Sequence, residues 1–229
     1  MVVPLAMGWR DLLLENWQIN PVEMESHLPP ALTLDTFDGD AWLSVIPFVN
    51  IAVRPRGVPA SLGTRIPELN VRTYVSYDGY PGVYFFSLDA DGLATVLGAR
   101  LLHWLPYYYA SISVDRQDVV QFRSQRRHPG ARAAMYELTY QPSSDPYQAH
   151  EDPLAEFLFE RYRLFTESPD GSIRYTSVTH KPWVVQTADA SVETNTIAYA
   201  TGFDVAIHDP VRYYSSGVDV VAHPSRTID

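Results

Sequence analysis

The chain has no cysteine, and only one of its seventeen basic residues, Lys181, is a lysine. The absence of cysteine excludes disulfides, thiol nucleophiles and cysteine-ligated zinc. The scarcity of lysine leaves arginine as the main cation and offers one candidate for a catalytic amine. An acidic composition with almost no lysine fits both adaptation to high salt and the codon bias of a GC-rich genome, and the sequence does not separate these explanations.

Long apolar runs are also missing. The longest, residues 41–53, is interrupted by Ser44, Pro47 and Asn50 and is too short to span a bilayer. Residues 1–7 lack the basic start and the small-residue cleavage site of a signal peptide. The net charge of −10 disfavours nucleic acids and anionic membranes as partners. We therefore expect a cytoplasmic protein with no nucleic acid and no membrane as partner.

Several common motifs are absent from the sequence. It contains no G-x-S-x-G elbow, no dinucleotide-binding fingerprint and no P-loop. Seven histidines are present, but no two have the close spacing of a metal-binding pair on a helix. We expect neither a cofactor nor a metal, and homo-oligomerisation is left open.

The composition is that of a folded domain. The chain has 229 residues, of which 46% are hydrophobic and 19% charged, a balance typical of globular proteins. This length suits one all-β or barrel-like domain, so we expect a single domain over residues 1–229.

Residue patterns predict many short strands separated by three helices. The predicted helices are residues 9–17, residues 89 or 91 to about 104, and a helix capped at Asp152 that runs to residue 165. The predicted strands are 41–54, 68–77, 83–88, 107–114, 119–124, 133–141, 173–178, 183–187, 192–201 and 203–207. Turns are expected at residues 78–79 and 81–82, and loops over 54–67 and 142–152. The fold class is therefore α+β, mostly antiparallel β, with a central barrel or half-open sheet and a few flanking helices.

The most informative segment is residues 68–75, E-L-N-V-R-T-Y-V. Because a strand alternates its faces, one face carries Glu68, Asn70, Arg72 and Tyr74, and the other is mainly apolar. This pattern has two interpretations. It is either an edge strand with a solvated face or a strand whose polar face lines a cavity. In a cavity, Arg72 would pair with a carboxylate, and Glu68 would orient the ligand or transfer protons.

A second strand, residues 107–114, has a similar character. One of its faces carries Tyr107, Tyr109, Ser111 and Ser113, and the other is mostly apolar. Hydroxyl groups on one face suit a cavity wall, although tyrosine is also common in cross-strand packing. Both interpretations are left open for each tyrosine.

Several strings of residues resemble one family. The most specific are E-L-N-V-R-T-Y-V at 68–75 and V-Y-F-F-S-L-D-A at 83–90, supported by L-D-T-F-D-G at 34–39, E-R-Y at 160–162 and His180 before Pro182-Trp183. These strings resemble the YqjF-like family of unknown function (DUF2071), a branch of the acetoacetate decarboxylase-like superfamily. The resemblance runs to about residue 185 and is loose over the last 45 residues. It implies an acetoacetate decarboxylase-like barrel that encloses a pocket.

The resemblance fails at the catalytic lysine of the decarboxylases. In those enzymes a Gly-Arg-Glu segment precedes a Pro-Lys-Lys segment, and a lysine forms a Schiff base with a β-keto acid. Here A-R-L at 99–101 and P-Y-Y at 106–108 occupy the comparable stretch, so that Tyr107 stands where the lysine would be. A phenol cannot form an iminium, and Lys181 lies far along the chain. We therefore expect no Schiff-base decarboxylation.

Together, the residues and the resemblance predict a polar barrel pocket that binds, and possibly turns over, a small organic (keto) acid. An enzyme of this kind would be lyase- or hydrolase-like. Glu68 and Tyr107 are the predicted catalytic residues, and the predicted ligand-binding residues are Asn70, Arg72, Tyr74, Arg100 and Tyr109. The alternative is a non-catalytic interaction protein that keeps the barrel as a scaffold, because a fold alone does not decide function.

Overall fold

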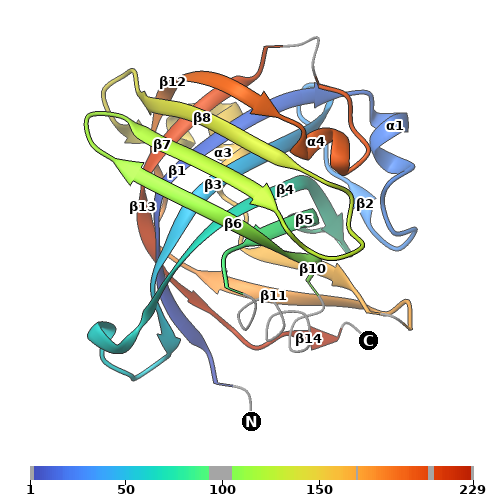
Figure 1. Cartoon of the computed structure of the whole chain (residues 1–229). Helices are drawn as coiled ribbons and strands as arrows, with labels where there is room; N and C mark the ends of the chain where they lie inside the picture. The colour runs from blue at the N-terminus through green and yellow to red at the C-terminus, as the bar shows by residue number, and fades with distance from the viewer. Residues whose placement is uncertain (1–2, 93–104, 169, 206–208, 228–229) are drawn as a thin grey trace.

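The computed structural model describes residues 3–92, 105–168, 170–205 and 209–227, and strands dominate them (Figure 1). The strands are β1 (Leu5–Ile19), β2 (Thr33–Leu34), β3 (Ala41–Pro55), β4 (Thr64–Tyr77), β5 (Tyr80–Ala90), β6 (Tyr107–Arg116), β7 (Val120–Arg126), β8 (Met135–Pro142), β9 (Tyr147–Gln148), β10 (Arg163–Glu167), β11 (Ile173–Thr179), β12 (Val184–Asn195), β13 (Val211–Ala222) and β14 (Arg226–Thr227). The helices are α1 (Pro21–Glu25), α3 (Pro153–Phe159) and α4 (Ile197–Ala200), with short 3₁₀ turns at Ala60–Leu62 and Ala149–Glu151. None of the helices in these ranges is long and apolar enough to cross a membrane.

The strands close into two rings that share a wall. The shared wall consists of β13, β1, β3, β4 and β5, each paired with the next. The first ring continues from β5 through β6, β7, β8 and β12 back to β13. The second ring continues from β5 through β10 and β11 back to β13. Most pairs are antiparallel, and β5 is parallel to both β6 and β10. The predicted mostly antiparallel fold with few helices is confirmed.

The middle of the shared wall is buried on both of its faces in β1, β3, β4 and β5. Along β3, every residue from Ala41 to Asn50 is buried. Ala41, Leu43 and Val45 belong to the core of the first ring, and Trp42, Ile46 and Phe48 belong to that of the second. Such a strand has a nearly continuous apolar sequence, because neither of its faces meets water.

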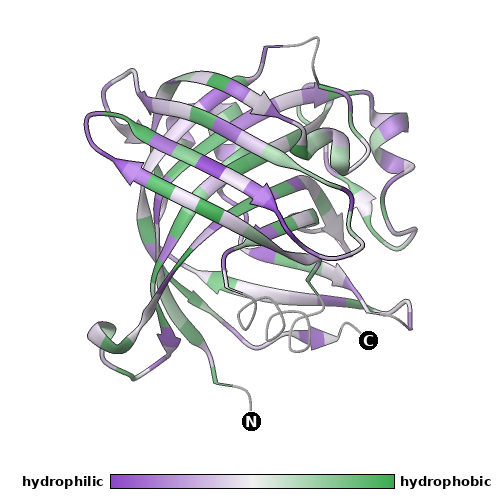
Figure 2. Ribbon diagram, in the orientation of Figure 1, coloured by the Kyte–Doolittle hydropathy of each residue, from purple (hydrophilic) through white to green (hydrophobic). Residues whose placement is uncertain are grey.

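The outer wall of the first ring, β6 to β8, buries only one face. Phe122 on β7 and Leu138 on β8 point into the core, whereas the residues next to them are more accessible. Figure 2 shows the corresponding alternation of hydrophilic and hydrophobic residues along β6 and β7. These strands were predicted almost to their ends, because a half-buried strand keeps its period of two.

The predicted helix at residues 9–17 is wrong, because this segment is part of β1. Asp11 has a positive φ of 54°, and the pairing of β1 with β3 shifts register between Arg10 and Glu15. This irregularity places Trp9 and Leu12, three residues apart, on the wall of the second ring. A β-bulge therefore produced the spacing of a helix.

Other predicted elements need correction. The helix capped at Asp152 begins as predicted, since the Asp152 carboxylate accepts hydrogen bonds from the backbone N–H groups of Leu154 and Ala155. It ends at Phe159 instead of residue 165, and β10 follows it. Residues 184–195 form one strand, and α4 replaces the predicted strand end at 197–200. Residues 203–205 are not in a strand, and β13 was missed entirely.

The region between β3 and β6 shows a similar mixture. The Asp78-Gly79 turn is confirmed, with positive φ at both residues. Residues 81–82 belong to β5, and the predicted loop over 54–67 contains the start of β4 at Thr64. The predicted helix at 93–104 lies outside the described residues, and Asp89, one of its two proposed caps, is in β5.

The pairing of β4 with β5 contains a second irregularity. Val71 pairs with Ser87 and Arg72 pairs with Phe85, so that Phe86 is an extra residue on β5. After this bulge, Leu88 faces the second ring, and Ser87 and Asp89 face the first. The bulge thus reverses the faces of the end of β5.

The two rings predict different costs for neighbouring truncations on β1. Leu13 is fully buried in the first-ring core, whereas Leu12 lines a cavity of the second ring. We expect Leu13→Ala to lower the free energy of unfolding by about 2–5 kcal/mol. Leu12→Ala should cost less, about 1–2 kcal/mol, because fewer neighbours lose contacts there. Urea unfolding of both variants measures this difference, and equal losses would show that the two rings are packed equally well.

Candidate functional site: a polar strand in an apolar cavity

The strands of the second ring surround a partly open cavity of about 340 Å³. Every strand of the second ring contributes to its wall, and β13 does so through its last residue, Ala222. Representative lining residues are Trp9, Phe48, Phe85, Phe159, Leu164, Val178 and Trp183. Most of the lining is apolar, which is typical of small-molecule sites that place a few polar groups in a hydrophobic pocket.

β4 contributes more polar groups to the cavity than any other strand. Glu68, Asn70 and Arg72 all line it, and the first two are only 6% and 5% exposed. β4 is paired with β3 on one side and with β5 on the other. It is therefore not an edge strand with a solvated face, and its polar face lies against the cavity.

Glu68 is held by several hydrogen-bond donors. The Tyr107 hydroxyl and the Asn50 amide donate to its Oε2 at 3.0 and 3.2 Å, and the Asn70 side chain also hydrogen-bonds to it. Burial raises the pKa of Glu68 from 4.5 to about 7, and the three hydrogen bonds oppose this shift. Near neutral pH this carboxyl group can therefore either give or take a proton.

Tyr107 has a different protonation behaviour. Burial, together with the charge and hydrogen bond of Glu68, raises the pKa of Tyr107 well above its usual value of 10. The phenol thus stays protonated at neutral pH and serves as a hydrogen-bond donor. Within this pair, Glu68 is the group suited to proton transfer, and Tyr107 orients it.

Arg72 has no acidic partner among the residues that the structure describes. Its Nη2 donates to the backbone carbonyl of Leu158 on α3 at 2.9 Å, and its Nε is buried without a hydrogen-bond partner. The guanidinium also lies 5.5 Å from the centre of the Tyr74 ring. No direct hydrogen bond joins Arg72 to Glu68. Among the described residues, the positive charge of Arg72 is therefore balanced only in part, by the dipole of the Leu158 carbonyl group.

The other predicted site residues lie in varied places. Tyr74 is fully buried, with its hydroxyl 2.6 Å from Ser44 Oγ and its ring against Phe157, and it is not part of the cavity lining. Tyr109 is half-buried and also does not line the cavity. β6 pairs with β5 only over residues 107–109, and the rest of β6 continues in the outer wall of the first ring beside β7. Ser111 and Ser113 are accordingly exposed. Arg100 lies outside the described residues.

Two cavity residues were missed from the sequence. Asn50, which donates to Glu68, interrupts the apolar run of β3, and this interruption was the only sign of it. Trp183 stacks on Trp9 with ring centres 6.1 Å apart, and both line the cavity. Lys181, which lies two residues before Trp183, is exposed and does not line the cavity.

A buried ion pair lies next to the site, inside the first ring. Arg126 on β7 donates through Nε to both carboxylate oxygens of Asp89, at 3.1 and 3.0 Å, and through Nη2 to Ser87. Its guanidinium also lies 4.0 Å from the ring centre of Tyr108, the residue after Tyr107. Arg126 follows Phe122 and Ser124 on the inward face of β7, so strand alternation could have located it. Within the described ranges, no three acidic or histidine side chains gather to hold a metal.

Solved structures of very different sequence share this fold. They include acetoacetate decarboxylase from Legionella pneumophila, at 16% identity and a TM-score of 0.67, covering 99% of this chain and 87% of that one. An acetoacetate decarboxylase-like enzyme from Sphingomonas wittichii RW1 reaches a TM-score of 0.70 at 13% identity, covering 100% and 94%. The enduracididine biosynthesis enzyme MppR, solved with pyruvate, gives 0.66 at 12%, covering 100% and 91%. The fold is therefore acetoacetate decarboxylase-like.

The family follows from sequence comparison. The chain belongs to the family DUF2071, described as an uncharacterized conserved protein, which matches residues 6–219. It is 39% identical over 224 residues to the uncharacterized protein YqjF of Bacillus subtilis (strain 168), covering 97% of this chain and 91% of that protein. The resemblance expected from the sequence is confirmed.

The raised pKa of Glu68 predicts a distinct dependence of stability on pH. Folding raises this pKa from 4.5 to about 7, so the folded state binds the proton more tightly than the unfolded state. Stability should therefore fall as pH rises from about 4.5 to 7 and then level off. The shift corresponds to about 3 kcal/mol. Relative to Glu68→Gln, the parent protein should lose this amount across that range in urea unfolding.

The control for this experiment is Glu193→Gln, at an exposed position on β12. Its pH profile should follow that of the parent protein. Parallel profiles for the parent and Glu68→Gln would mean that Glu68 ionises in the folded state as it does in a peptide.

Proposed function

We propose that the cavity binds a small organic acid whose carboxylate pairs with Arg72. The observation that carries this proposal is the guanidinium of Arg72 in a mostly apolar cavity, with a backbone carbonyl as its hydrogen-bond acceptor among the described residues. Removing a charge from water is costly unless it is paired. A ligand carboxylate would supply the missing charge, and the planar guanidinium can hold it with two parallel hydrogen bonds.

The geometry of β4 suggests how such an acid would lie. Glu68 and Arg72 are four residues apart on one face, about 13 Å by strand rise. A ligand bound at Arg72 would therefore extend along Asn70 towards Glu68. MppR, a protein of the same fold, forms a complex with pyruvate, which is a small organic acid, and this complex supports the ligand class.

Glu68 is the group through which turnover would occur. With a pKa of about 7, it exists in both protonation states near neutral pH, and the donors around it fix its orientation. Proton transfer to or from a bound acid would be lyase- or hydrolase-like chemistry. Tyr107 would keep Glu68 in position and donate a hydrogen bond to it. The protein's own side chains do not fill the interior of the second ring. This cavity favours a ligand-binding role over the alternative role of a scaffold for protein interactions.

Schiff-base chemistry is not part of this proposal. The family resemblance puts Tyr107 at the position of the decarboxylase lysine, and this phenol stays protonated. Lys181 is exposed and lies outside the lining of the cavity. Neither group is a desolvated amine of the kind that forms an iminium with a keto acid.

Substitution of Arg72 tests the proposal. We expect Arg72→Ala to weaken the binding of small carboxylates about tenfold to a hundredfold, because a charge-assisted contact contributes roughly 1.5–3 kcal/mol. Arg72→Lys should recover only part of this affinity, since the ammonium lacks the planar fork. Calorimetric titration with pyruvate, acetoacetate and butyrate measures the effect, and circular dichroism checks folding.

Arg123→Ala provides the matched control, because Arg123 forms an ion pair with Glu137 on the exposed face of β7 and β8. It should bind every acid as the parent protein does. If a folded Arg72→Ala variant also binds every acid as the parent does, the carboxylate site lies elsewhere. If no acid binds the parent protein, the proposal itself fails.

Trapping with borohydride tests the exclusion of a Schiff base. Incubation with acetoacetate and sodium borohydride should leave the mass of the protein unchanged, since an iminium is required for reductive labelling. Mass spectrometry of the intact chain gives the result. An adduct that disappears in Lys181→Arg would show that Lys181 reaches the substrate after all.

A further inference from the structure

The cavity has a polar half and an apolar half. Arg72 marks the polar half, which α3 covers through the contact of Arg72 with Leu158 and through Phe159 in the lining. From there, Asn70 and Glu68 follow along β4. The next cavity residue on this strand is Ile66, about 20 Å from Arg72 by strand rise.

Beyond Glu68, the described lining is almost entirely apolar. Its apolar members are Val3, Leu5, Met7, Val53, Ile66, Ala222 and Pro224, and its polar members are His223 and Asn50, which pairs with Ile66 and donates to Glu68. Strand register brings these residues to the same end of the ring. Leu5 pairs with both Pro55 and Ala222, Val53 pairs with Thr64, and Ile66 pairs with Asn50, which in turn pairs with Trp9. In Figure 1 the start of β1 and the strand β14 lie in the lower part of the view, well below the α3 label. The apolar half is thus the end of the cavity remote from α3.

The volume is large for a ligand of three or four carbons. A cavity of about 150 Å³ in another protein accommodates benzene, a molecule of six carbons. The cavity here is about 340 Å³. A small keto acid bound at Arg72 would leave the apolar half without a ligand group.

We propose that the preferred ligand is a carboxylic acid with an extended apolar chain of about eight to twelve carbons. Its carboxylate binds Arg72, and its chain passes Trp9 and Trp183 towards Met7 and Ile66. This inference rests on the proposed function, because it uses the same carboxylate site. It adds that chain length, rather than the carboxylate alone, determines which acid binds.

A series of straight-chain acids tests the inference. Calorimetric titration compares butyrate, hexanoate, octanoate and decanoate below their micelle concentrations, with 1-decanol as the ligand that lacks the charge. We expect affinity to rise about threefold to fourfold per added methylene, as apolar surface leaves water. We also expect 1-decanol to bind at least tenfold more weakly than decanoate, and this difference to vanish in Arg72→Leu.

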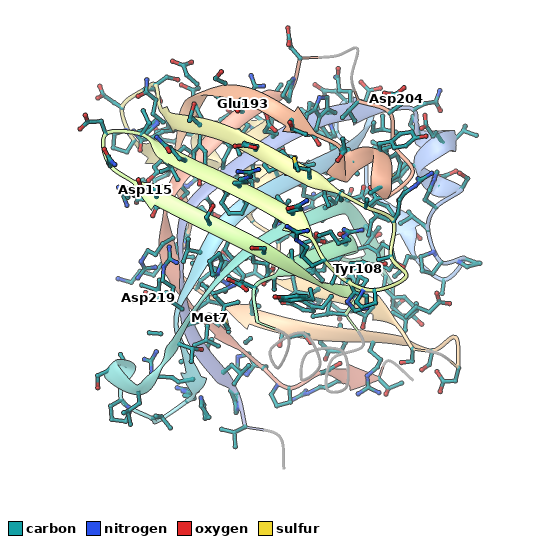
Figure 3. All side chains as sticks on the ribbon, viewed as in Figure 1. Met7, Tyr108, Asp115, Glu193, Asp204 and Asp219 are labelled. Carbon is teal, nitrogen blue, oxygen red and sulfur yellow. The ribbon has the colours of Figure 1, made fainter. Side chains whose placement is uncertain are left out.

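A pair of methionine variants locates the chain. Met7 lines the apolar half and is labelled in the lower part of Figure 3, whereas Met135 on β8 is also half-buried but belongs to the first ring. Met7→Gln should weaken decanoate about fivefold to tenfold and leave butyrate unchanged, because only the longer chain meets the polar amide. Met135→Gln should leave both affinities unchanged.

The outcomes separate the inference from the proposed function. If butyrate and decanoate bind equally and both depend on Arg72, the carboxylate site stands and the long chain is wrong. If 1-decanol binds the parent protein as tightly as decanoate, Arg72 does not hold the carboxylate, and both proposals fail. If Met7→Gln binds decanoate like the parent protein, the chain does not occupy the apolar half, and the inference is overturned.

Discussion

The wall shared by the two rings buries both of its faces over most of β1, β3, β4 and β5, and the rest of the structure depends on this constraint. Each side chain on the wall points into the first ring or into the second ring. Adjacent residues of one strand therefore contribute to different rings. Val71 packs into the first ring, and its neighbours Asn70 and Arg72 line the cavity of the second. The wall can therefore hold a polar surface on one side while its other side is held in place by a packed core.

This arrangement gives the site a rigid support. Burial destabilises the ionised form of Glu68. Hydrogen-bond donors from β3, β4 and β6 hold its carboxylate in place. On the other side of the wall, Arg126 and Asp89 are almost wholly buried and join β7 to the end of β5. A side chain held by strands that are paired on both sides keeps its orientation better than one on a loop. The polar groups of the cavity are thus preorganised.

The sequence predicted the strand-rich architecture, the family and the polar face of β4, because each depends on a local pattern. The alternation of Glu68, Asn70 and Arg72 indicated a shared face, and the structure brings all three to one cavity. The errors arose where a pattern was not local. The bulge at Asp11 imitates helical spacing, and β13 is recognisable only through its partners β1 and β12. Asn50 lies next to Glu68 because β3 pairs with β4, and this pairing cannot be read from the sequence.

The extra residue on β5 has a consequence for the charge of the cavity. Val83 and Phe85 face the second ring, and if Phe86 were paired regularly, the strand would keep its alternation and turn Asp89 into the cavity. Asp89 would then lie opposite Glu68, and two carboxyl groups would face the same cavity. Instead, Asp89 is matched with Arg126 on the opposite side of the wall. A single bulged residue thus decides on which side of the wall this buried carboxylate lies.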